Sequence, residues 1–489
     1  MHLLNVRALI PLFFTPVLIA AACGGSNRDF GSGSAGTTSG DAGESGNSGS
    51  SNSGGGAAGH AGKPQSGAGN AGTTGTDAGT TGADAGAGGE SGAPAVLPEC
   101  GAPGTACCAD DMCVANASCS ASSCGCAVKF SACGAGCVDF QADPKNCGSC
   151  GHNCLGGACD LGSCQPVPVV GNQTRVNLMV TDGKYLYWTG ADATGTTHYV
   201  ARRRVDASDA VKVIAPNEKG GYGLALSGDK VYWLALGHLR VCDLPDCATG
   251  PSDAIASVSP TGCGYGMLFE PTKKGLYWSC GSTYNQKNGT LFTLAAASTT
   301  PAALGTNPSN PGTLVKDVAN VYWINSSTYT ADNLNADGGL WRVRLSDGVT
   351  TQLVSGLRGD ISHLAIGGNA LYFSGNIQIP GSNPIMFTQA VLRAPLPNGL
   401  GGLMLPKFAD AKNVYGMVAD DQHLYYVDGA STTGAITRCP IAACPSPEVI
   451  VPGLENPTMG TQDSVSIYWK TTTYMPGGAS TSNIERLAK

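Results

Sequence analysis

The sequence predicts an all-β protein: a β-propeller of about seven four-stranded blades, preceded by a small disulfide-rich module and a disordered linker. Three observations support this prediction: an aromatic pair that recurs at a near-constant period, a segment dense in cysteine, and a long segment without large apolar side chains. The expected boundaries in the 489 residues are 1–22 for an export signal, 23–98 for the linker, 99–164 for the cysteine-rich module and 165–489 for the propeller.

The aromatic pair occurs seven times in the C-terminal part of the chain, and subtracting neighbouring positions gives steps of 45, 45, 45, 50, 53 and 43 residues. A period of this size is typical of arrays of small β-sheets, usually a propeller. We expect the pairs to pack between adjacent sheets. They are Tyr187-Trp188, Tyr232-Trp233, Tyr277-Trp278, Tyr322-Trp323, Tyr372-Phe373, Tyr425-Tyr426 and Tyr468-Trp469.

The second copy shows the expected contents of one blade. Four short β-patterned runs separated by turn residues fit a four-stranded sheet. The runs are Tyr222–Ser227, Lys230–Leu236, His238–Leu244 and Ala254–Val258. The last copy lacks a fourth run, whereas an apolar run, Pro166–Val170, precedes the first copy. Pairing Pro166–Val170 with Asn483–Ala488 would complete the last blade, close the ring and remove an open sheet edge.

The N-terminus has the pattern of a lipoprotein signal peptide. Ala8–Ala22 is apolar but shorter than the roughly 20 residues that span a bilayer. The run ends in Ala20-Ala21-Ala22-Cys23-Gly24, which resembles the bacterial lipobox, although that family favours Leu where this chain has Ala20. The resemblance implies a lipid on Cys23, and hence an exported protein held at the outer membrane or cell surface. Ordinary cleavage at the same small residues is the alternative.

The segment Gly31–Ala95 contains no Leu, Ile, Val, Met or aromatic residue. Such a segment cannot bury enough apolar surface to offset the entropy of ordering, so we expect it to be disordered. As a flexible coil it would reach roughly 45 Å. Together with a lipid at Cys23 it would form a surface tether.

Cys100–Cys164 holds 14 of the 21 cysteines and few large apolar side chains. Disulfides should therefore hold this module, in an oxidising compartment, through seven bridges of unassigned connectivity. The pattern Asp143-Pro144-x-Asn146-Cys147-Gly148-x-Cys150, continued by Cys154, Cys159 and Cys164, resembles the plant stigma-specific cysteine-rich proteins and their bacterial relatives. That resemblance implies a secreted disulfide module. A zinc site at Cys147, Cys150, His152 and Cys154 is the less favoured alternative.

Apart from Cys23, the six cysteines outside this module fit local bridges within blades. Cys242 and Cys247 occupy the same place in the second copy as Cys439 and Cys444 in the sixth. Cys263 and Cys280 are equidistant from a turn, and such positions face each other in an antiparallel pair. We therefore expect disulfides 242–247, 263–280 and 439–444, and no metal site.

The aromatic pairs and the strands that follow them resemble the YWTD-type propeller repeat of lipoprotein-receptor ectodomains. Leu186-Tyr187-Trp188-Thr189 matches the pair, and Arg342 with Asp347-Gly348 matches the following strand and turn. The motif's own Asp is kept only at Asp428, and that family has six blades. The resemblance supports the blade pattern and implies no ligand.

The charge balance argues against a nucleic-acid partner. The net charge is −7, and only 13% of residues are charged, whereas a nucleic-acid surface needs clustered Lys and Arg. The one basic run, Arg202-Arg203-Arg204, is expected in a strand on a solvated blade surface.

No catalytic motif or cofactor site is recognised, so the candidate site rests on propeller geometry. The first strands of all blades converge near the central channel, and residues at their starts could bind a small polar or sugar-like ligand through stacking and hydrogen bonds. These residues are Arg175, Tyr222, Tyr265, Asp360, His363 and Tyr415. The alternative is that the Tyr-Gly sequences merely begin the strand, with Gly allowing close approach of chains.

Two functions follow from this pattern. The first is a lipid-anchored, surface-exposed, non-enzymatic propeller that binds a protein or a glycan. The alternative is a propeller lyase or hydrolase that uses His363 with Asp360 at the channel mouth. That pair is weakly supported, because residues three apart in a strand point to opposite faces.

Overall fold

The computed structural model describes residues 100–255, 263–270, 275–280, 289–295, 298–306, 311–325, 329–330, 333–334, 338–357, 361, 363–378, 387–396, 407–430, 432–476 and 478–489. The predicted signal peptide, the predicted lipid site Cys23, the predicted linker and Asp360 lie outside these residues. Among the described residues, no helix is both long and apolar enough to span a bilayer.

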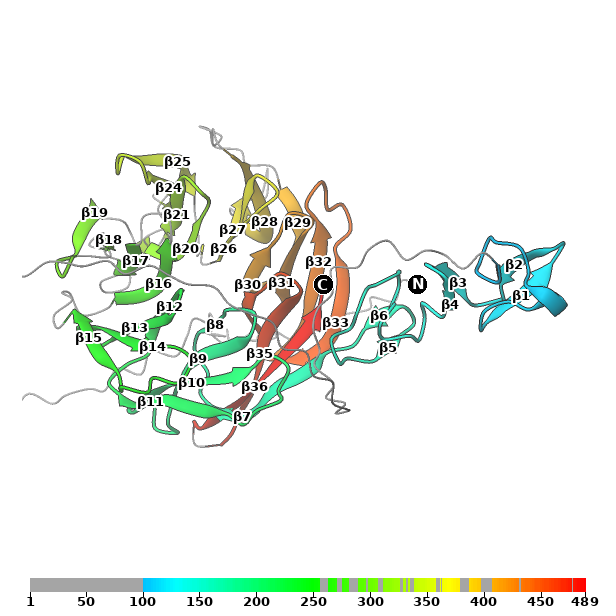
Figure 1. Cartoon of the computed structure of the whole chain (residues 1–489). Coiled ribbons are helices and arrows are strands. Elements are labelled where there is room, and N and C mark those ends of the chain that lie inside the picture. Colours follow the sequence, from blue (N-terminus) through cyan, green and yellow to red (C-terminus); the bar gives the residue numbers. More distant parts are fainter. Residues whose placement is uncertain are drawn as a thin grey trace, which may run out of the picture. The chain divides into compact units, whose positions relative to one another are not determined.

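The predicted all-β fold is confirmed: seven four-stranded antiparallel sheets follow one another around a ring (Figure 1). Blade 1 consists of β8 (Met179–Thr181), β9 (Tyr185–Ala191), β10 (His198–Arg204) and β11 (Lys212–Glu218). Blade 2 consists of β12 (Tyr222–Ser227), β13 (Lys230–Ala235), β14 (His238–Asp243) and β15 (Ser252–Ile255). Blade 3 consists of β16 (Cys263–Glu270), β17 (Gly275–Cys280), β18 (Thr290–Ala295) and β19 (Ala302–Thr306).

The other blades repeat this order. Blade 4 consists of β20 (Pro311–Lys316), β21 (Asn320–Asn325), β24 (Gly338–Arg344) and β25 (Thr350–Leu357). The short hairpin of β22 (Tyr329–Thr330) and β23 (Asn333–Leu334) lies between its second and third strands. Blade 5 consists of β26 (Leu364–Gly367), β27 (Ala370–Gln378), β28 (Phe387–Pro395) and β29 (Lys407–Asp410), and blade 6 of β30 (Val414–Ala419), β31 (His423–Gly429), β32 (Thr433–Pro440) and β33 (Glu448–Glu455).

Blade 7 closes the ring. It consists of β34 (Thr458–Gln462), β35 (Ser466–Tyr474) and β36 (Ser480–Ala488), and its fourth strand is β7 (Val167–Thr174), which precedes blade 1 in the chain. Thr481 of β36 pairs with Thr174 of β7, and Arg486 pairs with Val167. The predicted closure is confirmed, with each strand longer than the apolar run suggested. The first strands of neighbouring blades contact one another all around the ring, from β8 to β34 and back.

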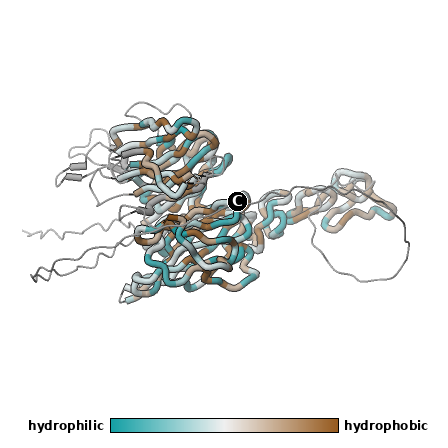
Figure 2. The backbone as a smooth tube through the Cα atoms, turned by 60° about the vertical axis from the view of Figure 1, so that its left-hand side comes forward, coloured by the Kyte–Doolittle hydropathy of each residue, from teal (hydrophilic) through white to brown (hydrophobic). Residues whose placement is uncertain are grey.

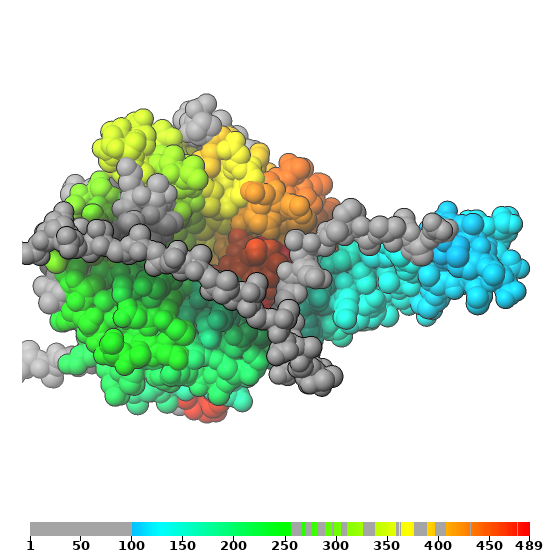
Figure 3. All heavy atoms as spheres, in the orientation of Figure 1, coloured from blue at the N-terminus to red at the C-terminus, as the bar shows by residue number. Residues whose placement is uncertain are grey.

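Each aromatic pair spans two interfaces between blades. Neighbouring residues of a strand point to opposite faces of its sheet. The Tyr of one copy accordingly packs in the same buried cluster as the second aromatic of the next copy, as Tyr187 does with Trp233 and Tyr322 with Phe373. Tyr468 of the last copy packs with Trp188 of the first, so the same contact closes the ring. Hydrophobic and hydrophilic stretches are mixed along the backbone in Figure 2, and Figure 3 shows one face of the molecule with all heavy atoms drawn as spheres.

The Tyr of a pair is also held by an aspartate in the hairpin that precedes its strand. Asp317 accepts a hydrogen bond from the hydroxyl of Tyr322 at 2.6 Å, and its other oxygen accepts the backbone N–H groups of Ala319 and Asn320. Asp182 with Tyr187 and Asp463 with Tyr468 repeat the arrangement. Burial and the carboxylate raise the pKa of these tyrosines, so they stay protonated donors. The sequence signal is Asp followed five residues later by the pair's Tyr.

The first strands pack against one another through glycine and methionine. Gly223 and Gly416 have φ values of +65° and +105°, and each lies at an irregularity in the pairing of its strand. A Cβ atom on Gly416 would lie 2.9 Å from Cβ of Met459 in the next blade, and one on Gly223 would lie 3.0 Å from Cε of Met267. The Gly of the Tyr-Gly sequence is thus required by the backbone and by its neighbour.

The expectation for the basic run was wrong at Arg202. This side chain is buried. Two carboxylates compensate for its burial, since the guanidinium forms an ion pair with Asp209 and donates from Nε to Asp246 at 2.9 Å. Asp246 belongs to the loop after β14, so the ion pair joins blade 1 to blade 2. Arg203 donates to three backbone carbonyls.

The cysteine-rich module contains the short hairpins β1–β2 (Ala117–Ser120, Ser123–Cys126), β3–β4 (Ser131–Cys133, Gly136–Val138) and β5–β6 (Cys159–Asp160, Ser163–Cys164), and one 3₁₀ turn, η1 (Ala109–Asp111). Its disulfides pair 100–108, 107–119, 113–124, 126–137, 133–150, 147–159 and 154–164. Cys147, Cys154 and Cys164 share a buried cluster with Tyr425 and Trp469 of the propeller. The second half of the module therefore packs on blades 6 and 7.

We predict that Gly416→Ala destabilises the protein by about 2 kcal/mol or more, because a side chain there is strained by the positive φ and also meets Met459. The matched control is Gly183→Ala, where φ is +85° but a Cβ atom would have no neighbour within 4 Å. That control should lose about 1 kcal/mol. Chemical denaturation measures both, and an equal loss would contradict the packing role.

We predict that Asp246→Asn lowers stability by about 1 kcal/mol at neutral pH, a value kept small because more than a third of the Asp246 side chain is exposed. A hydrogen bond from Arg202 holds the pKa of Asp246 below its ordinary value. The stabilisation is present above the unfolded pKa, near 4, and is lost as the pH falls through the lower folded pKa. Unfolding curves between pH 7 and about pH 2 should therefore converge for wild type and variant. A difference independent of pH would contradict the ionic origin.

Candidate functional site

The starts of all first strands lie on one face of the propeller, because the seven sheets have the same strand order and direction. The connections from each fourth strand to the next first strand lie there, together with the turns between second and third strands. We call this the channel-mouth face. In blades 3 to 5 much of it lies outside the described residues.

Tyr222 is the sequence-predicted residue that the structure places at the surface of this face. It begins β12, and 48% of it is exposed. Its ring lies 5.8 Å from the imidazole of His198, measured between ring centroids and tilted by 50°. Leu236, which is 61% exposed, follows β13, and its backbone N–H donates to Lys219 just before Tyr222. Tyr222, His198 and Leu236 thus form an apolar, partly aromatic surface over blades 1 and 2, here called the Tyr222 patch.

His198 holds a buried polar atom beneath the Tyr222 patch. Its Nδ1 is buried and has no hydrogen-bond partner among the described residues. Burial lowers the pKa of His198 below its ordinary value, so the ring is neutral at neutral pH. A neutral imidazole can donate one hydrogen bond and accept another.

The other residues of the predicted ring are placed differently. Tyr415 is partly buried and packs against the cluster between blades 6 and 7, although it shares the Tyr-Gly sequence with Tyr222. Arg175 donates through Nη2 to the carbonyl of Gly478 at 3.0 Å, which ties the start of blade 1 to a turn of blade 7. His363 precedes β26, and burial lowers its pKa to about 4. Asp360 and the side chain of Tyr265 lie outside the description.

Lys470 is a residue of this face that sequence reasoning missed. Its Nζ donates to the carbonyls of Val176 and Asn177, at the start of blade 1. Burial lowers the pKa of Lys470 to about 8. The residue after the aromatic pair makes the same kind of link elsewhere: Thr189 donates to Gly221 and Ser279 to Gly312, each in the next blade. The available signal was that Lys470 is the one charged residue at this position among the seven copies.

Asp428, which keeps the Asp of the repeat motif, also acts on this face. Its Oδ1 accepts the backbone N–H groups of Lys412 at 2.7 Å and Asn413 at 3.1 Å. The carboxylate thereby holds the connection that enters β30. Its role in the structure is to position the start of a first strand.

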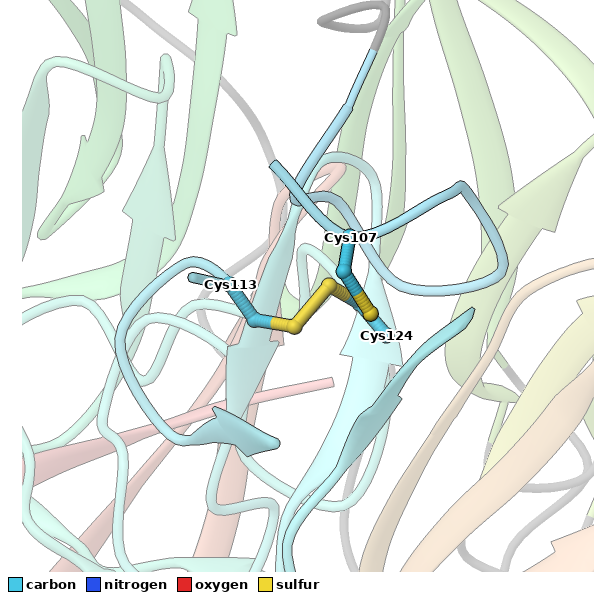
Figure 4. Close-up of side chains that lie close together, drawn as sticks. All are labelled: Cys107, Cys113 and Cys124. Carbon is cyan, nitrogen blue, oxygen red and sulfur yellow. A yellow bond between two sulfur atoms is a disulfide. The ribbon is translucent and has the colours of Figure 1, made fainter. Parts of the chain in front are cut away.

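The cysteine clusters that could suggest metal ligands consist of disulfide-bonded sulfurs. In Figure 4 the side chains of Cys107, Cys113 and Cys124 lie close together, and a bond joins Cys113 to Cys124. Cys107 is bonded to Cys119. The cysteines of the alternative zinc site are bonded as 147–159, 133–150 and 154–164, so none is a free thiolate.

The cysteines of the propeller were predicted to form local bridges. The structure joins Cys242 to Cys247 and Cys439 to Cys444. Cys280 is disulfide-bonded, and its register partner across β16 and β17 is Cys263.

No protein-family model and no curated protein matches this sequence. Among solved structures, the chain is similar to the nidogen/laminin complex, with 14% identity, a TM-score of 0.33, and coverage of 57% of this chain and 82% of that one. It is also similar to the β-propeller domain of the Trilobed protease from Pyrococcus furiosus, with 9% identity, a TM-score of 0.44, and coverage of 64% and 93%. A third similarity, to a prolyl endopeptidase, has 13% identity and a TM-score of 0.44, covering 65% of this chain and half of that chain's length. These low values carry no argument about function.

Proposed function

We propose that this protein is a lipid-anchored, surface-exposed binding protein whose propeller holds a protein or glycan ligand at the channel-mouth face, on the Tyr222 patch. The observation that supports this most directly is the exposed ring of Tyr222 beside a neutral imidazole and the exposed Leu236. Rigid aromatic side chains with a polar tip suit sugar faces and protein anchors alike. The rigid blade below keeps the patch preorganised, which lowers the entropic cost of binding.

A binding role is supported by the structural role of Asp192, the carboxylate nearest in sequence to His198. Asp192 accepts hydrogen bonds from the hydroxyl of Thr194 at 2.7 Å and from the backbone of Thr196 at 3.0 Å. These bonds hold its pKa well below the ordinary value, so it carries a fixed charge and does not exchange protons near neutral pH. Asp192 therefore shapes a turn, and we propose no general acid or base at this patch.

The lipid anchor is proposed from the sequence around Cys23 and from the chemistry of the segment that follows it. A segment rich in Gly, Ser, Ala and Thr has the composition of a tether between a lipid and a folded domain. The disulfides of the described module fit an oxidising, extracytoplasmic compartment.

We predict that Tyr222→Ala weakens ligand binding about tenfold, because it removes the exposed ring from the patch. Glycan and peptide arrays, followed by titration of any captured ligand, measure the effect. Tyr474→Ala is the matched control, since Tyr474 is an exposed tyrosine in blade 7. Equal binding by wild type and Tyr222→Ala, or no captured ligand at all, would count against this function.

We predict that Cys23→Ser moves the protein from the membrane fraction to the soluble extracytoplasmic fraction, because it removes the thiol that would carry the lipid. Mass spectrometry of the N-terminal peptide should show an acylated cysteine in the wild type only. Cys280→Ser is a control that leaves Cys23 intact. An unmodified Cys23 in the mature protein would exclude the anchor while leaving the Tyr222 patch to be judged separately.

A further inference from the structure

An open pocket of about 460 Å³ lies where the outer strands of blade 5 meet the loop that follows β32 of blade 6. Its charged lining consists of Arg393, Lys407 and Asp410, and Phe408 with residues 442–445 supplies apolar surface. A pocket of this size accommodates a small ligand. The loop between third and fourth strands lies opposite the channel-mouth face, so this pocket is independent of the Tyr222 patch.

The pocket lies at the junction of blades 5 and 6, which resembles the junction of blades 1 and 2. Arg202 pairs across the sheet with Tyr187, and Arg393 pairs in the same way with Tyr372. In both cases the next blade has a loop closed by a disulfide between cysteines five residues apart, 242–247 and 439–444. The lysine of the fourth strand is placed differently, because Lys212 faces Arg202 across the sheet whereas Lys407 faces Leu392, the neighbour of Arg393. The two junctions therefore present an equivalent arginine to the same kind of loop.

The junctions differ in their carboxylates. In the first, Asp246 stands directly before the second cysteine of the loop and lies between Arg202 and Lys212, at 3.1 Å from the lysine nitrogen. In the second, the residue before Cys444 is Ala443. The counterpart of Asp209 is missing too, since the sequence from Leu396 to Pro406 contains no acidic residue. Arg393 thus occupies the place of Arg202 without either of its built-in partners.

The groups around Arg393 leave its charge available to a ligand. Among the described residues, Arg393 donates a hydrogen bond from Nε to the hydroxyl of Tyr372 at 3.3 Å, which orients the guanidinium. Asp410, the acidic residue of the lining, pairs with Lys407 at 2.7 Å. The two side chains are 77% and 50% exposed, and such an exposed ion pair contributes little to stability. The ring of Phe408 packs edge-on against Tyr372 at 4.9 Å, which fixes the apolar wall.

We propose that this pocket binds a small carboxylate ligand, whose carboxylate takes the place beside Arg393 that Asp246 takes beside Arg202. Arginine binds a carboxylate through two parallel N–H groups, which favours this planar anion. The apolar body of the ligand would lie against Phe408 and the alanines of the loop. The loop itself is held in place, since Ile441 donates to Gln422 and accepts from Tyr372.

The test uses the full chain and benzoate as the probe, at constant ionic strength with chloride as the reference salt. Benzoate should raise the unfolding midpoint of the wild type and should show saturable binding by calorimetry. In Arg393→Met, which keeps an apolar stem but removes the guanidinium, binding should fall at least tenfold. Arg344→Met, at an exposed arginine paired with Asp347, is the matched control and should bind as the wild type does.

A second variant tests the same site by filling it. Ala443→Asp restores the carboxylate that the other junction has, so it should raise the unfolding midpoint by about 2 °C and abolish benzoate binding. Ala443→Asn has the same shape without the charge and should do neither. Glucuronate and a capped tripeptide with one glutamate, used as further probes, distinguish a small acid from an acidic side chain as the source of the carboxylate.

Several results would overturn the proposal. They are equal responses to benzoate in wild type and Arg393→Met, binding of inorganic phosphate with none of any carboxylate, and binding of the glutamyl peptide alone. A loss of stability in Ala443→Asp that exceeds the loss in Ala443→Asn would also overturn it, because Arg393 would then not stabilise a carboxylate at this position.

Discussion

The contact on which the rest of this structure depends is the burial of each aromatic pair between three consecutive sheets. The Tyr and its neighbour point to opposite faces, so one pair packs into two interfaces, and Tyr468 with Trp188 makes the chain of contacts circular. Buried aromatic side chains carry most of the apolar surface of such interfaces. Because every interface has the same anchor, the ends of the strands are free to differ from blade to blade, and it is at these ends that both candidate ligand sites lie.

The polar links show how the anchor is supported. An aspartate in the preceding hairpin holds the hydroxyl of the Tyr, as Asp317 does for Tyr322, and the residue after the pair reaches into the next blade, as Thr189 does with Gly221. At the junction of blades 7 and 1 this second role falls to Lys470, whose charged group is satisfied by two carbonyls. These links satisfy polar groups that would be costly to bury alone.

Much of the fold could be predicted from the sequence, because a repeated core leaves a periodic signal. The seven blades, the strands of the second copy from Tyr222 to Asp243 and the pairing of β7 with β36 all follow from it. The site could be predicted less well. Tyr222 and Tyr415 share a local sequence, yet one is exposed and the other packs against a core, since their surroundings come from neighbouring blades. The burial of Arg202 depends on Asp246, 44 residues away, and no local pattern contains that contact.

The closing strand has a consequence for the order in which the molecule can be assembled. Thr174 pairs with Thr481, and subtracting the two positions gives a sequence separation of 307 residues. β7, the first propeller strand to be made, therefore has no partner until β36 has been made, and both strands present an open edge until they pair. The ring can therefore close only after the third strand of blade 7 has been made. The cysteine-rich module packs against blade 7 through Cys164 and Leu155. This contact reduces the conformational freedom of β7, which follows the module in the chain.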